Sequence, residues 1–264
     1  MTTYDPEAYW SRVGLEIGKR GEYRLAAGDD DPFLRYKRAK FLTRFLDSLD
    51  LSEQVVLELG CGPGGNLRHI AERQKPKRLI GADISETMCD LARQNLAAYA
   101  GLVDLHKIDG RTLPLQDRSV DVSFTVTVLQ HVTDEAMFAS LVGELCRITR
   151  REVVVMEDIG KSRQDGGRGS WIGRTVGVYE RAFARHGFAL SDVRFLGLAV
   201  SRWWYVPIML VNRIVSGRHH EGETVGSVLK LAMGGPLVLT RYLDDVVPDR
   251  VDLAKMVYRR PAPN

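Results

Sequence analysis

Short apolar runs alternate with amphipathic stretches through the middle of the chain. The β-branched and aliphatic runs predict strands near 54–59, 78–83, 103–108, 119–126 and 152–157. The stretches between and after them predict helices near 64–73, 86–99, 134–149 and 171–187. This alternation is typical of a parallel sheet with helices on both faces. Right-handed crossovers then place the carboxyl ends of the strands at one edge, where ligands bind.

Two more strands are predicted near the end of the chain, at 188–198 and 251–259, which gives seven strands in all. About fifty residues, 199–250, separate these two strands, although a short connection would be enough. Because so long and apolar an insertion is usually functional, we expect it to roof the substrate side of the sheet edge. The pattern therefore predicts a doubly wound, mostly parallel α/β sheet with a helical insertion before its last strand.

The first fifty residues predict two helices, one over 5–24 and one from about residue 32 to residue 49. Aspartates at positions 29–31 precede Pro32. Carboxylates cap the free N–H groups of a helix start, and proline fits the first turn. This run therefore indicates where the second helix begins.

Composition and charge narrow the class of protein. A chain of 264 residues fits a single domain, 1–264, and its net charge of +3, spread along the chain, gives no nucleic-acid footprint. The three cysteines have no metal-ligand spacing, and their odd number argues against a disulfide framework. The sequence shows neither a signal peptide nor an apolar run of about 18 residues. We therefore expect a cytoplasmic protein without a metal site, a nucleic-acid partner or stable membrane insertion.

A glycine-rich turn follows the first predicted strand. Glycines let a ligand approach the backbone without meeting a Cβ, and the next helix directs free N–H groups at the same crevice. Gly60, Gly62 and Gly65 satisfy the dinucleotide fingerprint G-x-G-x-x-G. Asp83, at the end of the second strand, would then hold a ribose hydroxyl. One interpretation is therefore an NAD-dependent oxidoreductase.

Glu58, two residues before the first glycine, favours a different cofactor. The stretch E-L-G-C-G-P-G at 58–64 resembles motif I of class I, Rossmann-like S-adenosylmethionine (SAM) dependent methyltransferases of the small-molecule type. The resemblance continues over about residues 50–160. Asp83 ends the second strand, Asp109 follows the third, and the turn in VDVSFTVTVLQHVTD follows the fourth.

The resemblance implies how the chain is divided. In this family the last strands form an antiparallel finish, and N-terminal helices lie over the SAM site. Residues 1–50 would accordingly form a helical lid and 51–198 the cofactor-binding core. The insertion at 199–250 would be a substrate cap, and 251–264 would be the last strand and tail.

The resemblance also implies SAM as the cofactor and S-adenosylhomocysteine as its product. The two oxygens of Asp83 match the two ribose hydroxyls, whereas Glu58 would orient groups near the methionine amino group or act as a structural brace. Asp109 would accept a bond from the adenine amino group, although Asp-Gly is also a turn signal. The residues expected to bind the cofactor are Glu58, Gly60, Cys61, Gly62, Gly64, Asp83, Ile84, Asp109, Gly110 and Thr127.

Methyl transfer is an in-line displacement at an activated sulfonium, so the protein must chiefly align the reactants and exclude water. A base is needed only when the nucleophile is a hydroxyl or an acidic C–H group. His131 follows the fourth strand, and Glu157 and Asp158 end the fifth, so these three are the candidate catalytic residues. The alternatives are a turn or pocket-lining role for His131, and a helix cap or salt bridge for the two acids.

Aromatic residues supply the candidates for substrate binding. Tyr9 and Trp10 lie in the predicted lid, and Trp203, Trp204 and Tyr205 lie in the insertion. All of them could instead be core residues. The apolar insertion could also form a homodimer contact, or lie on a membrane surface beside a lipid-linked substrate.

The sequence thus predicts methyl transfer from SAM to a small molecule, such as a hydroxyl oxygen of a natural product, a sugar or another metabolite. Secondary metabolism would suit such a reaction. A SAM-fold protein that catalyses a non-methylating reaction, such as a cyclisation, remains an alternative, as does methylation of a lipid-linked substrate. The near-neutral charge balance disfavours RNA as a substrate, and nothing marks a protein site.

Overall fold

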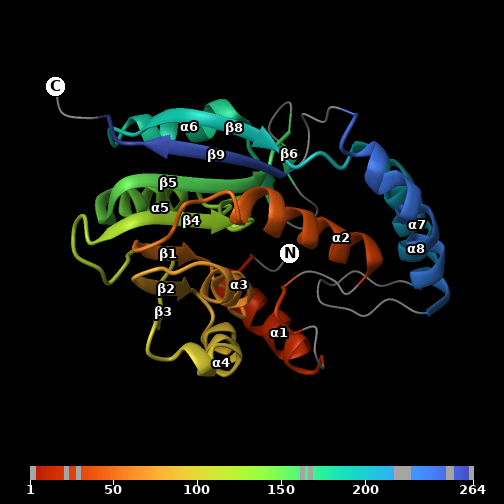
Figure 1. Ribbon diagram of the computed structural model, residues 1–264, viewed down its shortest axis with the longest axis horizontal. Coiled ribbons are helices and arrows are strands. Elements are labelled where there is room, and N and C mark those ends of the chain that lie inside the picture. Colours follow the sequence, from red (N-terminus) through yellow and green to blue (C-terminus); the bar gives the residue numbers. More distant parts are fainter. Residues whose placement is uncertain are drawn as a thin grey trace.

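The computed structural model describes residues 4–20, 24–27, 31–160, 164–165, 169–216, 227–247 and 253–261. Its main sheet contains β1 (Val55–Leu59), β2 (Arg78–Asp83), β3 (Val103–Lys107), β4 (Val120–Val126), β5 (Thr149–Asp158), β8 (Ala189–Phe195) and β9 (Leu253–Arg259). The strand order is β3-β2-β1-β4-β5-β9-β8 (Figure 1). Strands β1 to β5 pair in parallel, and β9 is antiparallel to both of its neighbours. The predicted seven-stranded, mostly parallel sheet with an antiparallel end is confirmed.

Helices cover both faces of the sheet because successive side chains of a strand point to opposite sides. Leu57 of β1 packs in one core with α5 (Glu135–Ile148) and α6 (Val176–Ala184). Its neighbour Val56 packs in the other core with residues of α3 (Gly65–Arg73) and α4 (Glu86–Asn95). The doubly wound arrangement follows from this alternation in buried, apolar strands.

Side-chain caps fix where several helices begin. Asp5 accepts a hydrogen bond from the backbone N–H of Ala8 at the start of α1 (Pro6–Gly18). Asp31 caps α2 (Pro32–Phe41) in the same way, and both helices have proline in the first turn. α2 continues as a π-helical turn, η1 (Leu42–Leu46), whereas α1 ends well before residue 24.

The region after β5 differs from the sequence prediction. The two short strands β6 (Gln164–Asp165) and β7 (Ile172–Gly173) pair with each other, and α6 begins only at Val176. Short 3-10 turns, η2 (Ala97–Tyr99) and η3 (Leu129–His131), follow α4 and β4. The turn η3 lies at the carboxyl edge of the sheet and shapes the site described below.

The insertion between β8 and β9 forms two helices, α7 (Ala199–Ser216) and α8 (Ser227–Leu243). Figure 1 shows them beyond the carboxyl ends of β4 and β5, with α2 between them and the sheet. Tyr205 of α7 stacks on Phe33 of α2 with ring centroids 4.1 Å apart, and its hydroxyl donates to Asp31. The insertion therefore docks on α2. Among the residues described, no helix has both the length and the apolar character needed to cross a membrane.

Candidate active site

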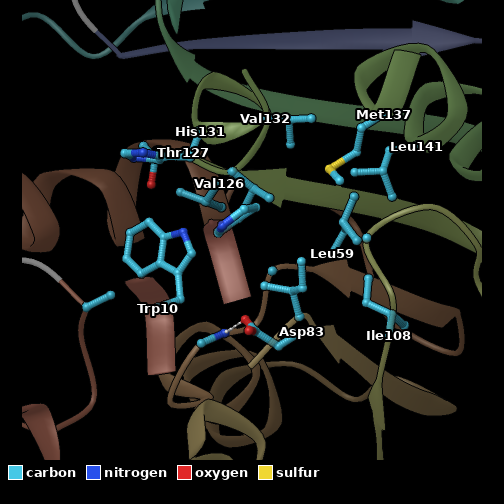
Figure 2. A pocket seen from close by; sticks show the side chains of 17 residues that line it. Trp10, Leu59, Asp83, Ile108, Val126, Thr127, His131, Val132, Met137 and Leu141 are labelled. Carbon is cyan, nitrogen blue, oxygen red and sulfur yellow. Dashed lines mark hydrogen bonds between the residues drawn. The ribbon is translucent and has the colours of Figure 1, made fainter. Parts of the chain in front are cut away.

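A pocket opens at the carboxyl ends of β1, β2 and β4 and holds about 710 Å³ of empty space, part of it open to solvent (Figure 2). Figure 2 shows Trp10, Thr127 and His131 at one end, and Ile108, Met137 and Leu141 at the other. Most of its wall is apolar, which is typical of a small-molecule site. The lining residues are Pro6, Trp10, Ala27, Leu59, Gly60, Gly62, Asp83, Ile84, Ile108, Gly110, Val126, Thr127, Val128, His131, Val132, Met137 and Leu141.

Gly60 and Gly62, in the glycine-rich turn after β1, require glycine for different reasons. Both have positive φ, +71° at Gly60 and +50° at Gly62. A Cβ on Gly60 would lie only 2.1 Å from Cγ2 of Val128, whereas a Cβ on Gly62 would meet no atom of the described residues within 4 Å. Gly60 is therefore required by packing against the turn after β4. Gly62 leaves open space beside the pocket, as a cradle for a ligand would.

We expect Gly60→Ala and Gly62→Ala to separate these two roles. Gly60→Ala combines a strained backbone with a clash and should lower the free energy of unfolding by about 3 kcal/mol. Gly62→Ala should cost only about 1 kcal/mol in stability, from the backbone strain alone, but its methyl group should weaken cofactor binding. Chemical denaturation and calorimetry on both variants would measure this. Equal losses of stability would contradict the assignment.

Asp83 ends β2 at the floor of the pocket. Its Oδ2 accepts from the backbone N–H of Gly62 at 2.8 Å, and its Oδ1 accepts from Ser85 at 2.9 Å. Burial raises the pKa of this carboxyl, against the lowering effect of the N–H bonds. Because a carboxylate has about four acceptor positions, both oxygens can still bind a ligand hydroxyl. This placement suits the expected ribose contact.

The buried Glu58 and the half-buried Asn66 form a pair behind the glycine turn. Asn66 Nδ2 donates to Glu58 Oε1 at 2.6 Å. The other two oxygens, Glu58 Oε2 and Asn66 Oδ1, are buried and have no hydrogen-bond partner among the described residues. Burial raises the pKa of Glu58 from 4.5 to about 8. Unsatisfied buried acceptors are costly, and a cation close by, such as the ammonium of the SAM methionine, would offset that cost through its charge. Together with the open space at Gly62 and the carboxyl group of Asp83, which line the pocket, this pair fits the cofactor.

This pair gives a pH-dependent prediction. With a pKa of about 8, Glu58 of the free protein is largely protonated at about pH 7. A cationic ligand nearby lowers that pKa, so SAM binding should release a proton near pH 7 and almost none near pH 9. Calorimetry at each pH in buffers of different ionisation enthalpy measures the release. Glu58→Gln should abolish it, and an equal release by the variant would assign the proton to another group.

Not every predicted cofactor residue reaches the pocket. Gly60, Gly62, Asp83, Ile84, Gly110 and Thr127 line it, whereas Glu58, Cys61, Gly64 and Asp109 do not. Asp109 is exposed, and its Oδ1 accepts from the backbone N–H groups of Arg111 and Thr112, each at 2.8 Å. These bonds lower the pKa of Asp109. Its carboxylate closes its own turn, so the structure does not bring it to the expected adenine contact.

His131 lies at the opposite end of the pocket from Leu141. Its Nδ1 is 2.9 Å from the carbonyl oxygen of Ser170, which can only accept, so Nδ1 carries the hydrogen of the neutral ring. Nε2 is then the acceptor nitrogen, and the amide Nε2 of Gln130 donates to it at 3.5 Å. Trp10 of α1 meets the imidazole edge-on, with ring centroids 5.0 Å apart. The arrangement leaves an unprotonated ring nitrogen beside an apolar pocket.

The two acids at the end of β5 have other partners. Glu157 is fully buried, and its oxygens accept from the backbone N–H groups of Val128, Leu129 and Gln130 at 2.9–3.1 Å. Burial raises its pKa to about 8. Asp158 pairs with Lys37 of α2 at 3.2 Å. Neither acid lines the pocket, so their positions do not fit the role of base expected from the sequence.

The aromatic residues expected to bind the substrate also fall into two groups, one that lines the pocket and one that does not. Trp10 lines the pocket, whereas Tyr9 packs against Trp10 with a centroid distance of 5.2 Å and does not line it. Trp203 and Trp204 are 87% and 49% exposed, and neither they nor Tyr205 reaches the pocket. Sequence reasoning missed the apolar wall. Its signal was the position of Leu59, Val126 and Ile108 at or just after strand ends and of Met137 and Leu141 in the first half of α5.

Known proteins resemble the core of the chain. Residues 56–152 match the model of a methyltransferase domain family. The malonyl-[acyl-carrier protein] O-methyltransferase of a Marinomonas strain is 38% identical over 92 residues, 34% of this chain and 33% of that protein. The N-demethylindolmycin N-methyltransferase of Streptomyces griseus is 33% identical over 96 residues, 36% of this chain and 38% of that protein. The chain thus spans about a third of the length of these curated relatives.

A comparison with solved structures extends the similarity from this core to the fold of the chain as a whole. A chain from the Haloferax volcanii complex that contains the Trm112 methyltransferase activator superposes with a TM-score of 0.64 at 16% identity. The match covers 98% of this chain and 99% of that one, so the whole described fold is shared. The motif series, the family match over residues 56–152 and this fold support a class I, Rossmann-like SAM-dependent methyltransferase.

Proposed function

We propose that the protein transfers the methyl group of SAM to a hydroxyl oxygen of a small-molecule acceptor, such as a natural-product intermediate or a sugar. The observation that carries this proposal is His131, whose acceptor nitrogen Nε2 belongs to a residue of the pocket wall while Nδ1 is held by Ser170. A hydroxyl nucleophile needs such a base, whereas an amine can lose its proton after the transfer.

In the proposed mechanism, Asp83 and the cradle at Gly62 would hold the ribose and methionine portions of SAM, and the apolar end near Ile108 and Met137 would hold the adenine. When bound, SAM would supply an activated methyl group on a sulfonium, with a neutral thioether as the leaving group. His131 Nε2 takes the hydroxyl proton as the oxygen–carbon bond forms, and the Ser170 carbonyl stabilises the resulting imidazolium. Trp10 and the apolar wall exclude water from the reacting atoms.

The test combines binding with product analysis. Calorimetric titration with SAM, S-adenosylhomocysteine and NADH comes first, followed by a panel of small phenols, sugars and their matched amines analysed by mass spectrometry. We expect both sulfur compounds to bind and the added methyl group to appear on hydroxyl acceptors. Methylation of the amines alone would overturn the oxygen assignment. NADH binding without either sulfur compound would overturn the cofactor.

The hairpin of α7 and α8 is the second feature that calls for a function. Its exposed apolar side chains include Trp203, Leu239 and Tyr242, which are 87%, 73% and 63% exposed. When large apolar side chains gather on one exposed surface, that surface is usually an interaction site. We propose that this surface is a contact between two copies of the chain.

Light scattering should therefore give a dimer for the wild type and a monomer for Trp203→Ala combined with Leu239→Ser. Liposome flotation of both proteins is the parallel measurement. A monomeric wild type that floats with vesicles, when the variant does not, would instead favour a membrane surface and a lipid-linked acceptor.

A further inference from the structure

The turn η3, which carries His131, is held at its amino end by a buried carboxylate. The three backbone N–H groups of Val128, Leu129 and Gln130 all donate to Glu157, at 3.0, 2.9 and 3.1 Å. A single 3-10 turn has too few internal bonds to fix its own position. Glu157 therefore determines how far this turn lies from β5.

The carbonyl side of the same turn is held by a buried guanidinium. Arg174 has only 1% of its side chain exposed, and it lies between β7 and α6. Its Nη1 donates to the carbonyl of Leu129 at 2.8 Å and its Nη2 to that of Val132 at 2.9 Å. The guanidinium also lies over the ring of Phe138, 4.2 Å from its centroid, and pairs with Glu135 at 3.1 Å.

The segment that contains Arg174 also supplies the partner of His131. Ser170, four residues earlier, offers the carbonyl that accepts from Nδ1 of His131. Residue 174 is bridged to Ile159, directly after β5. One anchored segment therefore fixes both the turn and the carbonyl that selects the tautomer of its histidine.

We propose that Arg174 and Glu157 are positioning residues that clamp the two ends of the Leu129–His131 turn and so hold His131 with Nδ1 protonated and Nε2 as the nitrogen that acts on the acceptor. The expected effect on kcat rests on the proposed function, whereas the expected effect on the tautomer of His131 does not. Burying a guanidinium and a carboxyl group to hold one short turn is costly compared with an apolar packing of equal volume. The cost is understandable if the position of this turn sets the geometry of the reacting groups, because small displacements at a reacting centre slow the reaction strongly.

The experiment uses the full-length protein with Arg174→Lys and Glu157→Gln. Arg147→Lys is the matched control, because Arg147 also donates to two loop carbonyls, those of Leu113 and Leu115, yet does not line the pocket. Nitrogen-15 NMR of the His131 side chain, without any acceptor present, reports its tautomer. Calorimetry with SAM and thermal unfolding accompany it, and kcat and KM are measured on an acceptor where one is found.

We expect the wild type and Arg147→Lys to show a single Nδ1–H tautomer. Arg174→Lys and Glu157→Gln should each show a mixture of tautomers, a kcat at least tenfold lower, and SAM affinity within about twofold of the wild type. An unchanged His131 signal in both variants would overturn the proposal, even if both lose stability. If one variant does not fold, the other decides. A tautomer change without any methylated product would support the clamp while counting against the proposed function.

Discussion

Asp83→Ala should reduce the affinity for SAM and S-adenosylhomocysteine at least thirtyfold, about 2 kcal/mol at 25 °C. Two effects combine. The variant loses the charge-assisted bonds expected with the ribose hydroxyls, and each bond to a charged group contributes about 1.5–3 kcal/mol. It also releases the N–H of Gly62, which Asp83 Oδ2 holds at 2.8 Å in the motif turn. Calorimetric titration of both compounds measures the loss.

Two further variants locate the cause of that loss. Asp83→Asn keeps the shape of the side chain but has only one acceptor oxygen, so its affinity should lie between those of the wild type and the alanine variant. Asp104→Ala removes an exposed acid from the adjacent strand β3, where it pairs with Arg78, and should leave affinity unchanged. If Asp83→Ala binds within threefold of the wild type, the ribose assignment is wrong.

The core of the fold was predictable because its signals are local. Each buried parallel strand is an apolar run between turn residues, so β1 and β2 were found within a residue or two of their observed bounds. The segment after β5 was predicted less well. Its apolar residues near 172 pair as a short strand with residues 164–165 rather than opening a helix. That pairing depends on a partner strand, which periodicity within one window does not show.

The residues of the candidate site could likewise be predicted only where their signal is local. The glycine turn and Asp83 could be predicted because they occupy fixed positions relative to strand ends. The orientation of a side chain could not. Glu157 lies at the end of a strand and Asp109 just after one, but Glu157 is fully buried against backbone N–H groups, whereas Asp109 is exposed and closes its own turn. Arg174 gave no signal, because a buried arginine looks like a solvated one until its carbonyl partners are known.

The aromatic residues of the insertion show a third limit. Trp203, Trp204 and Tyr205 are consecutive, and a helix directs consecutive side chains to different sides. Tyr205 faces α2 and stacks on Phe33, whereas Trp203 faces solvent. The helix α2, distant in sequence, determines which side of α7 faces inward. Tyr36 of α2 also donates a hydrogen bond to Asp244, directly after α8, at 3.1 Å. Sequence predicts that such a helix is apolar, but not what it contacts.

His131→Gln should lower kcat for hydroxyl acceptors by about 10²- to 10⁴-fold, the range typical of a lost general base. The glutamine side chain remains polar and of similar length, but its amide cannot take up a proton. SAM affinity should change less than threefold, because the cofactor contacts proposed for Asp83 and Gly62 lie away from His131. Steady-state kinetics with a hydroxyl acceptor, together with calorimetry, measures both quantities.

The matched amine acceptor makes this result specific to proton removal. An amine that reacts as its free base needs no base at the moment of transfer, so its kcat should fall far less in His131→Gln. Trp10→Phe serves as the second control. Trp10 touches the same imidazole, with centroids 5.0 Å apart, yet its indole cannot take up a proton from the acceptor. Its replacement should affect both acceptors alike. Equal losses for hydroxyl and amine in His131→Gln would mean that the histidine shapes the pocket rather than acting as a base.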